Sequence, residues 1–551
     1  MCRMQAETIK IVRNPERSME IKMNETNIYP YQPVPVPAEP VKPDTEQSCI
    51  RKKYFPFFGI GTGVYALFYA FCMYRNASGI TYPFFIAGSL FFFCLCMKKL
   101  GLSIKKGSVC YMAGMLLLGV STACTADGRI IFFNHAGALL LMVGFLLHQF
   151  YDDSRWGFCR YLGSMICAIF GSIGEIARPF TDFVCYRRQK TRRKTGKGLY
   201  VLIGLAVSVP LFAFVWLLLI SADRIFMKMT IELFRALNLL NVIGFVCTAV
   251  VMFFAAYGLL SYLCERHLSE KETAGKRAES MVAVTVALPL TILYVVFSGV
   301  QIVCLFLGNV DMAGLTYAEY ARQGFFQLLF VCMLNLVLVL AGGHFFKESV
   351  LLKAVLTVMS LCTYIMIFSS GFRMILYIRH YYLTFLRILV LWALVVIFLL
   401  LTGVLIQIFA PGFPLFCYGI AVVSALYILL SFSRPDYLIA ACNLGNSEGK
   451  TVHNFFDADA YHDYWYLSGL CADAAPVILP FLESEGYDMK AQGMEAFWET
   501  QMDKRRYEPE EYWGYLYLEN LHEDVDDMGI RAFNFSRYAA RSTLKNYASA
   551  H

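Results

Sequence analysis

Charged residues are scarce in this sequence. Asp, Glu, Lys and Arg make up 16% of its 551 residues, whereas a typical soluble domain contains about 25%. Apolar residues make up 58% and are gathered in long uninterrupted runs. A soluble chain of this length would divide into domains joined by polar linkers. The scarcity of charge therefore excludes a soluble protein, and the runs predict an all-α, polytopic membrane protein.

The apolar runs contain almost no ionisable side chains. Lys353, at the edge of one run, is the only charged residue in them. Proton relays, ion-coupled transporters and intramembrane metalloproteases need ionisable groups within the membrane, where such groups are costly. The sequence therefore disfavours these activities. A path for lipids or neutral solutes stays open, because Gln301, Asn335 and Gln407 would either line such a path or form interhelical hydrogen bonds.

Signatures of catalysis and of metal or cofactor binding are missing as well. The sequence has no CxxC pair, no HExxH motif and no glycine-rich phosphate loop. Gly445-Asn-Ser-Glu-Gly449 matches G-x-S-x-G by letter only, since a nucleophile elbow needs a buried strand before it. We therefore predict no catalytic residue, no metal ligand and no cofactor, and an enzyme is the least favoured function.

Eleven runs are long enough to cross the membrane as helices, which takes about 20 residues each. No signal peptide precedes them, because the first 53 residues have no apolar core of their own. The predicted spans are residues 54–74, 80–97, 108–126, 130–150, 199–220, 239–262, 281–306, 324–345, 353–372, 388–410 and 414–432.

Lysine and arginine in short loops favour the cytoplasm, so their distribution predicts the orientation. Roughly twenty-two lie on the side of the N-terminus and nine on the other side. The N-terminus is therefore predicted to be cytoplasmic. An odd number of spans then places the C-terminus outside, and one miscounted span would reverse that placement.

The sequence divides into five parts. Residues 1–53 are a Pro-rich cytoplasmic tail that we expect to be disordered, and residues 54–150 hold the first membrane helices. Residues 151–198 form a cytoplasmic loop, in which apolar residues at helical spacing predict an interfacial helix. Residues 199–432 are the main membrane core. Residues 433–551 are acidic, and their aromatic and apolar residues predict a small helical C-terminal domain. An odd number of spans places this domain outside the cytoplasm.

The loop also contains a polybasic cluster. Seven cations within eleven residues could bind anionic lipid head groups, or could fix the orientation of the next span, and the two functions are compatible. The candidate lipid-contacting residues are Arg187, Arg188, Lys190, Arg192, Arg193 and Lys194.

A candidate binding site lies in two loops of the predicted outer side. Glu319 and Arg322 precede the eighth span, whereas Arg373, Tyr377 and Arg379 follow the ninth. Arginines on the outer side oppose the positive-inside bias, so we expect them to have anionic partners. We predict that the five residues converge under the acidic domain. In the alternative, Glu319 only caps the start of the next helix and the arginines are solvated.

Several motifs carry a resemblance to a known family, among them Ser221-Ala-Asp223, the Arg373 to Tyr377 stretch and Asn443, together with four longer motifs. The four longer motifs are Tyr317-Ala-Glu-Tyr-Ala-Arg-Gln-Gly-Phe-Phe326, Arg434-Pro-Asp-Tyr-Leu-Ile-Ala440, Tyr466-Leu-Ser-Gly-Leu-Cys-Ala-Asp-Ala-Ala-Pro476 and Arg531-Ala-Phe-Asn-Phe-Ser-Arg537. Together they resemble a bacterial group of multi-pass membrane proteins, the domain of unknown function forty-one seventy-three, which is related to forty-one fifty-three. The resemblance covers residues 200–541, and Tyr381-Tyr382 departs from it. It implies the same membrane fold and no established activity.

The function expected from these features is that of a non-enzymatic envelope protein that senses or scaffolds. Its partners would be membrane lipids and a protein bound through the acidic C-terminal domain, and no nucleic acid is expected. The alternative is a transporter or channel for a lipid or neutral solute. That alternative requires a continuous cavity between helices, lined by Gln301, Asn335 or Gln407. The oligomeric state is left open.

The predicted topology is tested by reporter fusions. A reporter fused after His551 should be active only outside the cytoplasm, and one inserted at Lys190 should be active only inside. A cytoplasmic signal from the C-terminal fusion would contradict this topology and would mean an even number of spans.

Overall fold

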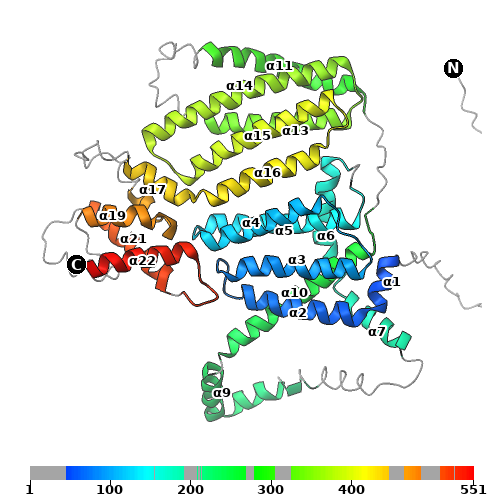
Figure 1. The fold of residues 1–551 in the computed structure, drawn as a ribbon, viewed down its shortest axis with the longest axis vertical. Helices are drawn as coiled ribbons and strands as arrows, with labels where there is room; N and C mark the ends of the chain where they lie inside the picture. The colour runs from blue at the N-terminus through cyan, green and yellow to red at the C-terminus, as the bar shows by residue number, and fades with distance from the viewer. Residues whose placement is uncertain are drawn as a thin grey trace, which may run out of the picture. The chain divides into compact units, whose positions relative to one another are not determined.

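The structure of this protein is a computed structural model, and its described part is all-α (Figure 1). Besides helices, that part contains one isolated bridge, between Ala278 and Phe346. The described residues are 45–153, 156–190, 208, 211–212, 214–236, 238–268, 278–303, 324–445, 464–485, 509–526 and 528–550.

Nine helices of the described part are long and apolar enough to cross a membrane, so the protein is a multi-pass membrane protein. A tenth, α4 (Ser108–Cys124), is apolar but only 17 residues long. Of the predicted span 199–220, residues 208, 211–212 and 214–220 are described, and they are helical. The nine are α2 (Phe55–Met73), α3 (Thr81–Lys99), α5 (Gly128–Phe150), α10 (Leu239–Cys264), α11 (Ser280–Gln301), α13 (Phe325–Phe345), α14 (Val350–Tyr381), α15 (Phe385–Phe409) and α16 (Leu415–Phe432).

Helix α14 extends further than predicted. Ser349 caps its start, since the Ser349 side chain accepts a hydrogen bond from the Leu352 amide at 3.2 Å. The helix ends only at Tyr381, before Tyr382, where φ is +63°. No glycine or proline interrupts the sequence after Gly371, so the helix continues beyond the apolar run. Arg373 and Tyr377 therefore lie on a helix rather than in a loop.

Two hydrophobic cores hold the membrane helices together. One is formed by α2 to α5, α10 and a further helix, α6 (Phe158–Gly174). The other is formed by α11, α13, α14 and α15. Helix α16 packs on both α15 and α4. Lipid offers the backbone no hydrogen-bond partner, so apolar segments satisfy their own backbone groups as helices.

Uncharged polar side chains join these helices where they are buried. Asn134 of α5 is fully buried and donates to Thr122 Oγ1 at 3.0 Å. Its Oδ1 accepts from the hydroxyls of Tyr427 and Ser431, both at 2.8 Å, on α16. One amide therefore ties three helices together, which is the interhelical role that membrane helices commonly give to asparagine.

The end of the predicted N-terminal tail is ordered. Residues Glu46–Lys53 form helix α1, which Thr45 caps by accepting from the Ser48 amide at 3.2 Å. The prediction of a disordered tail rested on the prolines, and these all precede residue 44, outside the described part. Helix α1 is held in place by its contacts with α10 and with α7 (Arg178–Lys190).

The predicted interfacial helix of the cytoplasmic loop is divided in two. Helix α6 (Phe158–Gly174) and helix α7 (Arg178–Lys190) are separated by a turn at residues 175–177. Pro179 is tolerated only in the first turn of a helix, which explains why α7 starts afresh rather than continuing α6. The apolar residues that predicted one helix run from Leu162 to Phe180, and they are therefore divided between α6, the turn and α7.

The small helical C-terminal domain is present. We call it the C-terminal module, and it has its own apolar core, centred on Ile478, Leu479, Tyr517 and Leu518. It consists of α17 (Pro435–Gly445), the 3-10 helix η3 (Ala472–Ala474), α19 (Ala475–Ser484), α21 (Pro509–Asp526) and α22 (Phe535–Ala550). Helix α9 (Arg224–Ala236) precedes α10 in the chain.

Asn134 provides a test of this packing. Asn134→Leu should lower the free energy of unfolding by about 1–2 kcal/mol, because interhelical hydrogen bonds in membranes are individually modest and three are lost here. The measurement is chemical unfolding in mixed micelles. The matched control is Thr285→Val, since this exposed hydroxyl bonds only to Met281 of its own helix. Equal stability of both variants would contradict the interhelical role.

Candidate functional site

The C-terminal module meets the membrane helices at a buried group of carboxylates. Asp127, at the start of α5, is 2% exposed, and Asp436 and Asp473 of the module are each 1% exposed. With Arg129 they form what we call the carboxylate cluster. Buried carboxylates are costly unless they are paired and hydrogen-bonded. Each of the three must therefore have partners.

Asp473 joins the module to the loop between α4 and α5. One carboxylate oxygen accepts from the Thr125 hydroxyl, and the other accepts from the Ala126 amide at 3.0 Å. The hydroxyl of Ser536, at the start of α22, also donates to this carboxylate. A single side chain thus connects η3, α22 and the end of the helical bundle.

Arg129 pairs with both of the other carboxylates. Its Nε and Nη2 donate to the two oxygens of Asp127, both at 2.9 Å, and Nη2 also pairs with Asp436. The second oxygen of Asp436 accepts from the Cys471 amide at 3.1 Å. Burial and the neighbouring charge of Asp127 raise the pKa of Asp436, while Arg129 opposes that rise. Two carboxylates therefore share one guanidinium, whose outer face packs on Phe385 at 4.1 Å from the ring centre.

Asn534 fixes the module from its other side. Its buried amide donates to the carbonyls of Ser78, Thr122 and Thr125, at 3.0, 3.3 and 2.8 Å. Its Oδ1 accepts from the Ser536 amide at 3.0 Å, which caps the first turn of α22. The module is therefore bound to the α2–α3 loop as well as to the α4–α5 loop.

A third loop, between α14 and α15, contacts the module too. Asn443 of α17 exchanges two hydrogen bonds with the backbone of Leu383, at 2.7 and 3.0 Å, and the Tyr466 hydroxyl accepts from the Phe385 amide at 2.9 Å. All three loops belong to the predicted outer side. Helix α1 precedes the start of α2, and the module contacts the end of α2, so the two lie at opposite ends of that helix.

The predicted outer site is only partly described. Arg373 is 7% exposed and donates to Gln301 Oε1 at 2.9 Å, an atom that also accepts from Ser369 at 2.6 Å. Tyr377 lies under the guanidinium of Arg387, at 4.2 Å from the ring centre, and Arg379 is exposed. Glu319 and Arg322 lie outside the described residues. The convergence of all five residues therefore stays a prediction.

The polybasic cluster is likewise described in part. Arg187 and Arg188 lie near the end of α7, where the Arg187 guanidinium packs on Phe183 at 5.3 Å, and Lys190 ends the helix. Arg192, Arg193 and Lys194 lie outside the described residues. Lipid contact by this cluster stays a prediction.

A second buried ionic group, which the sequence did not predict, ties α1 to α7 and α10. Arg51 and Asp182 are both fully buried, and Arg51 Nε donates to Asp182 Oδ2 at 2.8 Å. The same oxygen accepts from the Tyr257 hydroxyl at 2.7 Å, and Arg51 Nη2 reaches Glu265 at 3.4 Å. We call these residues the Arg51 cluster. It anchors the N-terminal helix to the bundle.

One group beside the Arg51 cluster has the composition of a metal site. Ligand atoms of Glu175, Glu265 and His267 lie within 4.8 Å of one another. Arg178, however, already pairs with both carboxylates, through Nε to Glu175 and through Nη2 to Glu265 at 2.6 Å. The guanidinium supplies the positive charge that a metal ion would bring, so the group forms an ion-pair network.

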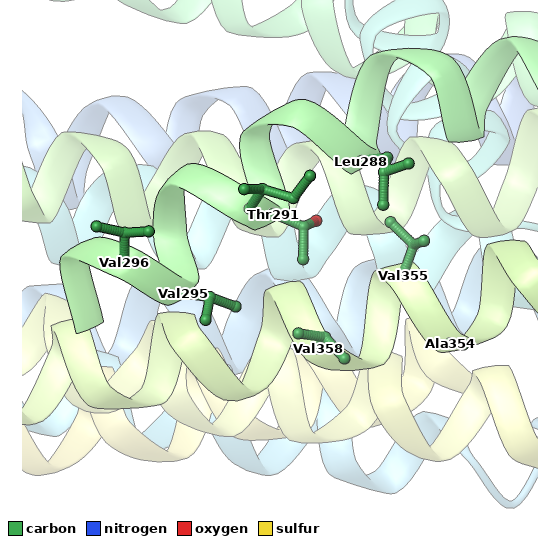
Figure 2. Close-up of a pocket in the computed structure, with 8 residues that line it drawn as sticks. Leu288, Thr291, Val295, Val296, Ala354, Val355 and Val358 are labelled. Carbon is green, nitrogen blue, oxygen red and sulfur yellow. The ribbon is translucent and has the colours of Figure 1, made fainter. Parts of the chain in front are cut away.

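Two of the three uncharged polar residues proposed to line a transport path, Gln301 and Asn335, form interhelical contacts. Asn335 is fully buried and donates to Thr363 of α14 at 3.0 Å, while Gln301 accepts from Ser369 and Arg373. By contrast, a groove between α11 and α14 has an apolar lining, which Figure 2 shows. Its volume is about 340 Å³. Its one hydroxyl, that of Thr291, bonds to Ala287 of its own helix at 2.8 Å. The lining residues are Leu288, Thr291, Ile292, Val295, Val296, Ala354, Val355 and Val358.

The carboxylate cluster could have been suspected from its sequence context. Asp436, Asp473 and Asn534 each belong to a different one of the motifs that carried the family resemblance. Asp436 and Asp473 are also isolated acidic residues among apolar neighbours, unlike the acidic runs around them. Such isolation indicates burial, but it does not show that three separate motifs meet.

The comparisons with known proteins agree with part of the predicted resemblance. The sequence model of one family, described as a domain of unknown function (DUF4153), matches residues 112–480. The matched range starts earlier than the predicted resemblance and ends before Arg531. It contains all four residues of the carboxylate cluster, whereas Asn534 and Arg51 lie outside it. No curated protein and no solved structure matches the chain.

Asp473 is the residue whose loss should detach the module. Asp473→Ala leaves three buried donors without an acceptor, and each such loss costs about 1–3 kcal/mol. We expect the module to become sensitive to protease in vesicles while the membrane helices stay folded. Glu523→Ala, an exposed carboxylate on α21, is the matched control. If both variants are cleaved at the wild-type rate, the carboxylate cluster does not hold the module.

Proposed function

This chain belongs to the DUF4153 family, and from that premise we propose that it is a non-enzymatic envelope protein that senses or scaffolds. Within the family, the motif from Tyr317 to Phe326 favours kinship with the related group forty-one seventy-three. The membrane helices serve as a platform, and the C-terminal module presents the surface that a protein partner binds.

The observation that carries this proposal is that the oxygens of Asp436 and Asp473 in the carboxylate cluster all have hydrogen-bond or ion-pair partners within the protein. An active site instead directs ionisable groups towards a space that a substrate can enter. Here the convergent charges are used to seat one part of the protein on another. This arrangement favours a scaffolding function over catalysis.

The contacts of the polar membrane residues weigh against the transporter alternative. Asn335 and Gln301 each bond to a neighbouring helix, and the groove between α11 and α14 offers no polar group free of its own helix. A solute path needs polar groups that face the path. The Asn335 amide nitrogen and Gln301 Oε1 therefore serve to join helices, and neither needs a path to explain it.

We further propose that the module is extracytoplasmic and that α1 is cytoplasmic. The support is the set of contacts that the module makes, since it binds the loops after α2, α4 and α14. The basic residues concentrate on the other side, beginning with Arg51, Lys52 and Lys53. On that side the polybasic cluster would face the anionic lipids of the inner leaflet.

In-cell crosslinking from the surface of the module tests the scaffolding function. A photo-reactive residue at Trp465, which is 53% exposed, or at the exposed Lys545 should yield a discrete protein adduct. The adduct should disappear when the module is detached by Asp473→Ala. The same residue at Val296, 62% exposed on α11, is the control and should yield lipid adducts. Absence of protein adducts, together with solute or lipid flux in reconstituted vesicles, would contradict the proposal.

A further inference from the structure

Helix α2 carries a continuous apolar stripe on its exposed face. Ile60, Val64, Leu67 and Phe71 are 68, 62, 55 and 52% exposed, and their spacing of three or four residues puts them on one side of the helix. Because α2 spans the membrane, this stripe is the surface that faces lipid. Phe71 marks its end on the side of the C-terminal module.

The module is fixed at the point where this stripe ends. Arg531 donates through Nη1 to the Phe71 carbonyl at 2.9 Å and through Nη2 to the Tyr74 carbonyl at 3.3 Å. Its guanidinium lies 5.7 Å from the centre of the Phe71 ring. Its own carbonyl accepts from the Asn76 side chain at 2.9 Å. The backbone at residue 531 is therefore held beside a lipid-facing aromatic ring.

The residues around Arg531 expose apolar side chains at this boundary. Ile530 is 95% exposed, which is unusual for an isoleucine on a segment so firmly fixed. Phe535 and Tyr538, on the first turn of α22, are 48 and 56% exposed. Both rings pack on Phe533, at 5.2 and 5.4 Å between ring centres.

This aromatic group also lies beside the start of α3. The Phe533 carbonyl accepts from the Ile80 amide at 2.7 Å, immediately before α3 begins at Thr81. Phe84, in the first turn of α3, is 63% exposed. The exposed apolar residues of the module are thus placed beside the ends of two membrane helices.

We propose that Ile530, Phe535 and Tyr538 insert into the headgroup region of the phospholipid bilayer and form a membrane anchor for the C-terminal module. Tyr538 favours this depth because it combines an apolar ring with a hydroxyl, while Ile530 and Phe535 supply apolar area that is buried at the boundary between head groups and acyl chains. The guanidinium of Arg531 lies at the same level, where a long basic side chain keeps its charge near water and phosphate. Continuity with the lipid-facing residues of α2 and α3 identifies a bilayer as the occupant.

This inference goes beyond the proposed scaffolding function. An anchored module contacts the bilayer and the membrane helices at once, so its attachment would depend on both. The anchor does not depend on the side of the membrane that the module occupies, because the module is fixed at the end of α2 and the start of α3 in either orientation.

Photo-crosslinking in lipid nanodiscs is the direct test. A benzophenone amino acid at position 530 of the full chain should form adducts with phosphatidylcholine or phosphatidylglycerol, detected by mass spectrometry. The same amino acid at position 523, exposed on α21, is the control and should form few. Equal lipid labelling at both positions, or labelling of residue 530 in cells by protein alone, would overturn the anchor.

Substitution of Ile530 provides a second measurement. Since the side chain is 95% exposed, Ile530→Ser removes almost no contact within the described part of the chain and should not disturb folding. If the residue is anchored in lipid, cleavage of the module by protease in vesicles should accelerate about fivefold, as expected for the loss of a partly buried isoleucine. Glu523→Ser is the matched control. An unchanged rate for Ile530→Ser would show that the side chain has no contact with the bilayer.

Discussion

The carboxylate of Asp473 joins the two parts of this protein. It accepts from the α4–α5 loop with both of its oxygens and from the first turn of α22, so the membrane helices and the C-terminal module share one buried acceptor. A buried carboxylate that loses its donors costs far more than a solvated one. The module can therefore be seated in one way only, with Thr125, Ala126 and Ser536 all directed at the same group.

Charge is scarce in the membrane spans, where Arg373 of α14 bonds to Gln301, and it is concentrated where helices end. At the start of α5, Arg129 pairs with Asp127 and Asp436, and in α1, just before α2, Arg51 pairs with Asp182. Buried ion pairs of this kind add little net stability compared with apolar packing, but removing one partner is costly. They therefore specify which segments meet. In this protein they determine where α1 and the C-terminal module attach.

The polar residues within the spans have a related role. Asn134 and Asn335 are fully buried and bond to hydroxyls on neighbouring helices. An amide in lipid has no water as an alternative partner, so it favours the arrangement of helices that satisfies it. Together with the ion pairs at the helix ends, these contacts specify how the helices and the module meet.

The sequence by itself determined the membrane helices, because a run of apolar residues in lipid has no stable alternative to the helix. It also determined the helical nature of the C-terminal module, because its apolar and aromatic residues need a core to pack in. Only the tertiary structure decided that Asp127, Asp436, Asp473 and Asn534 meet, because the loop that carries Asp127 is hundreds of positions from the other three and no local period relates them. The same holds for Arg51 and Asp182, whose burial depends on segments that each look solvent-exposed when taken alone.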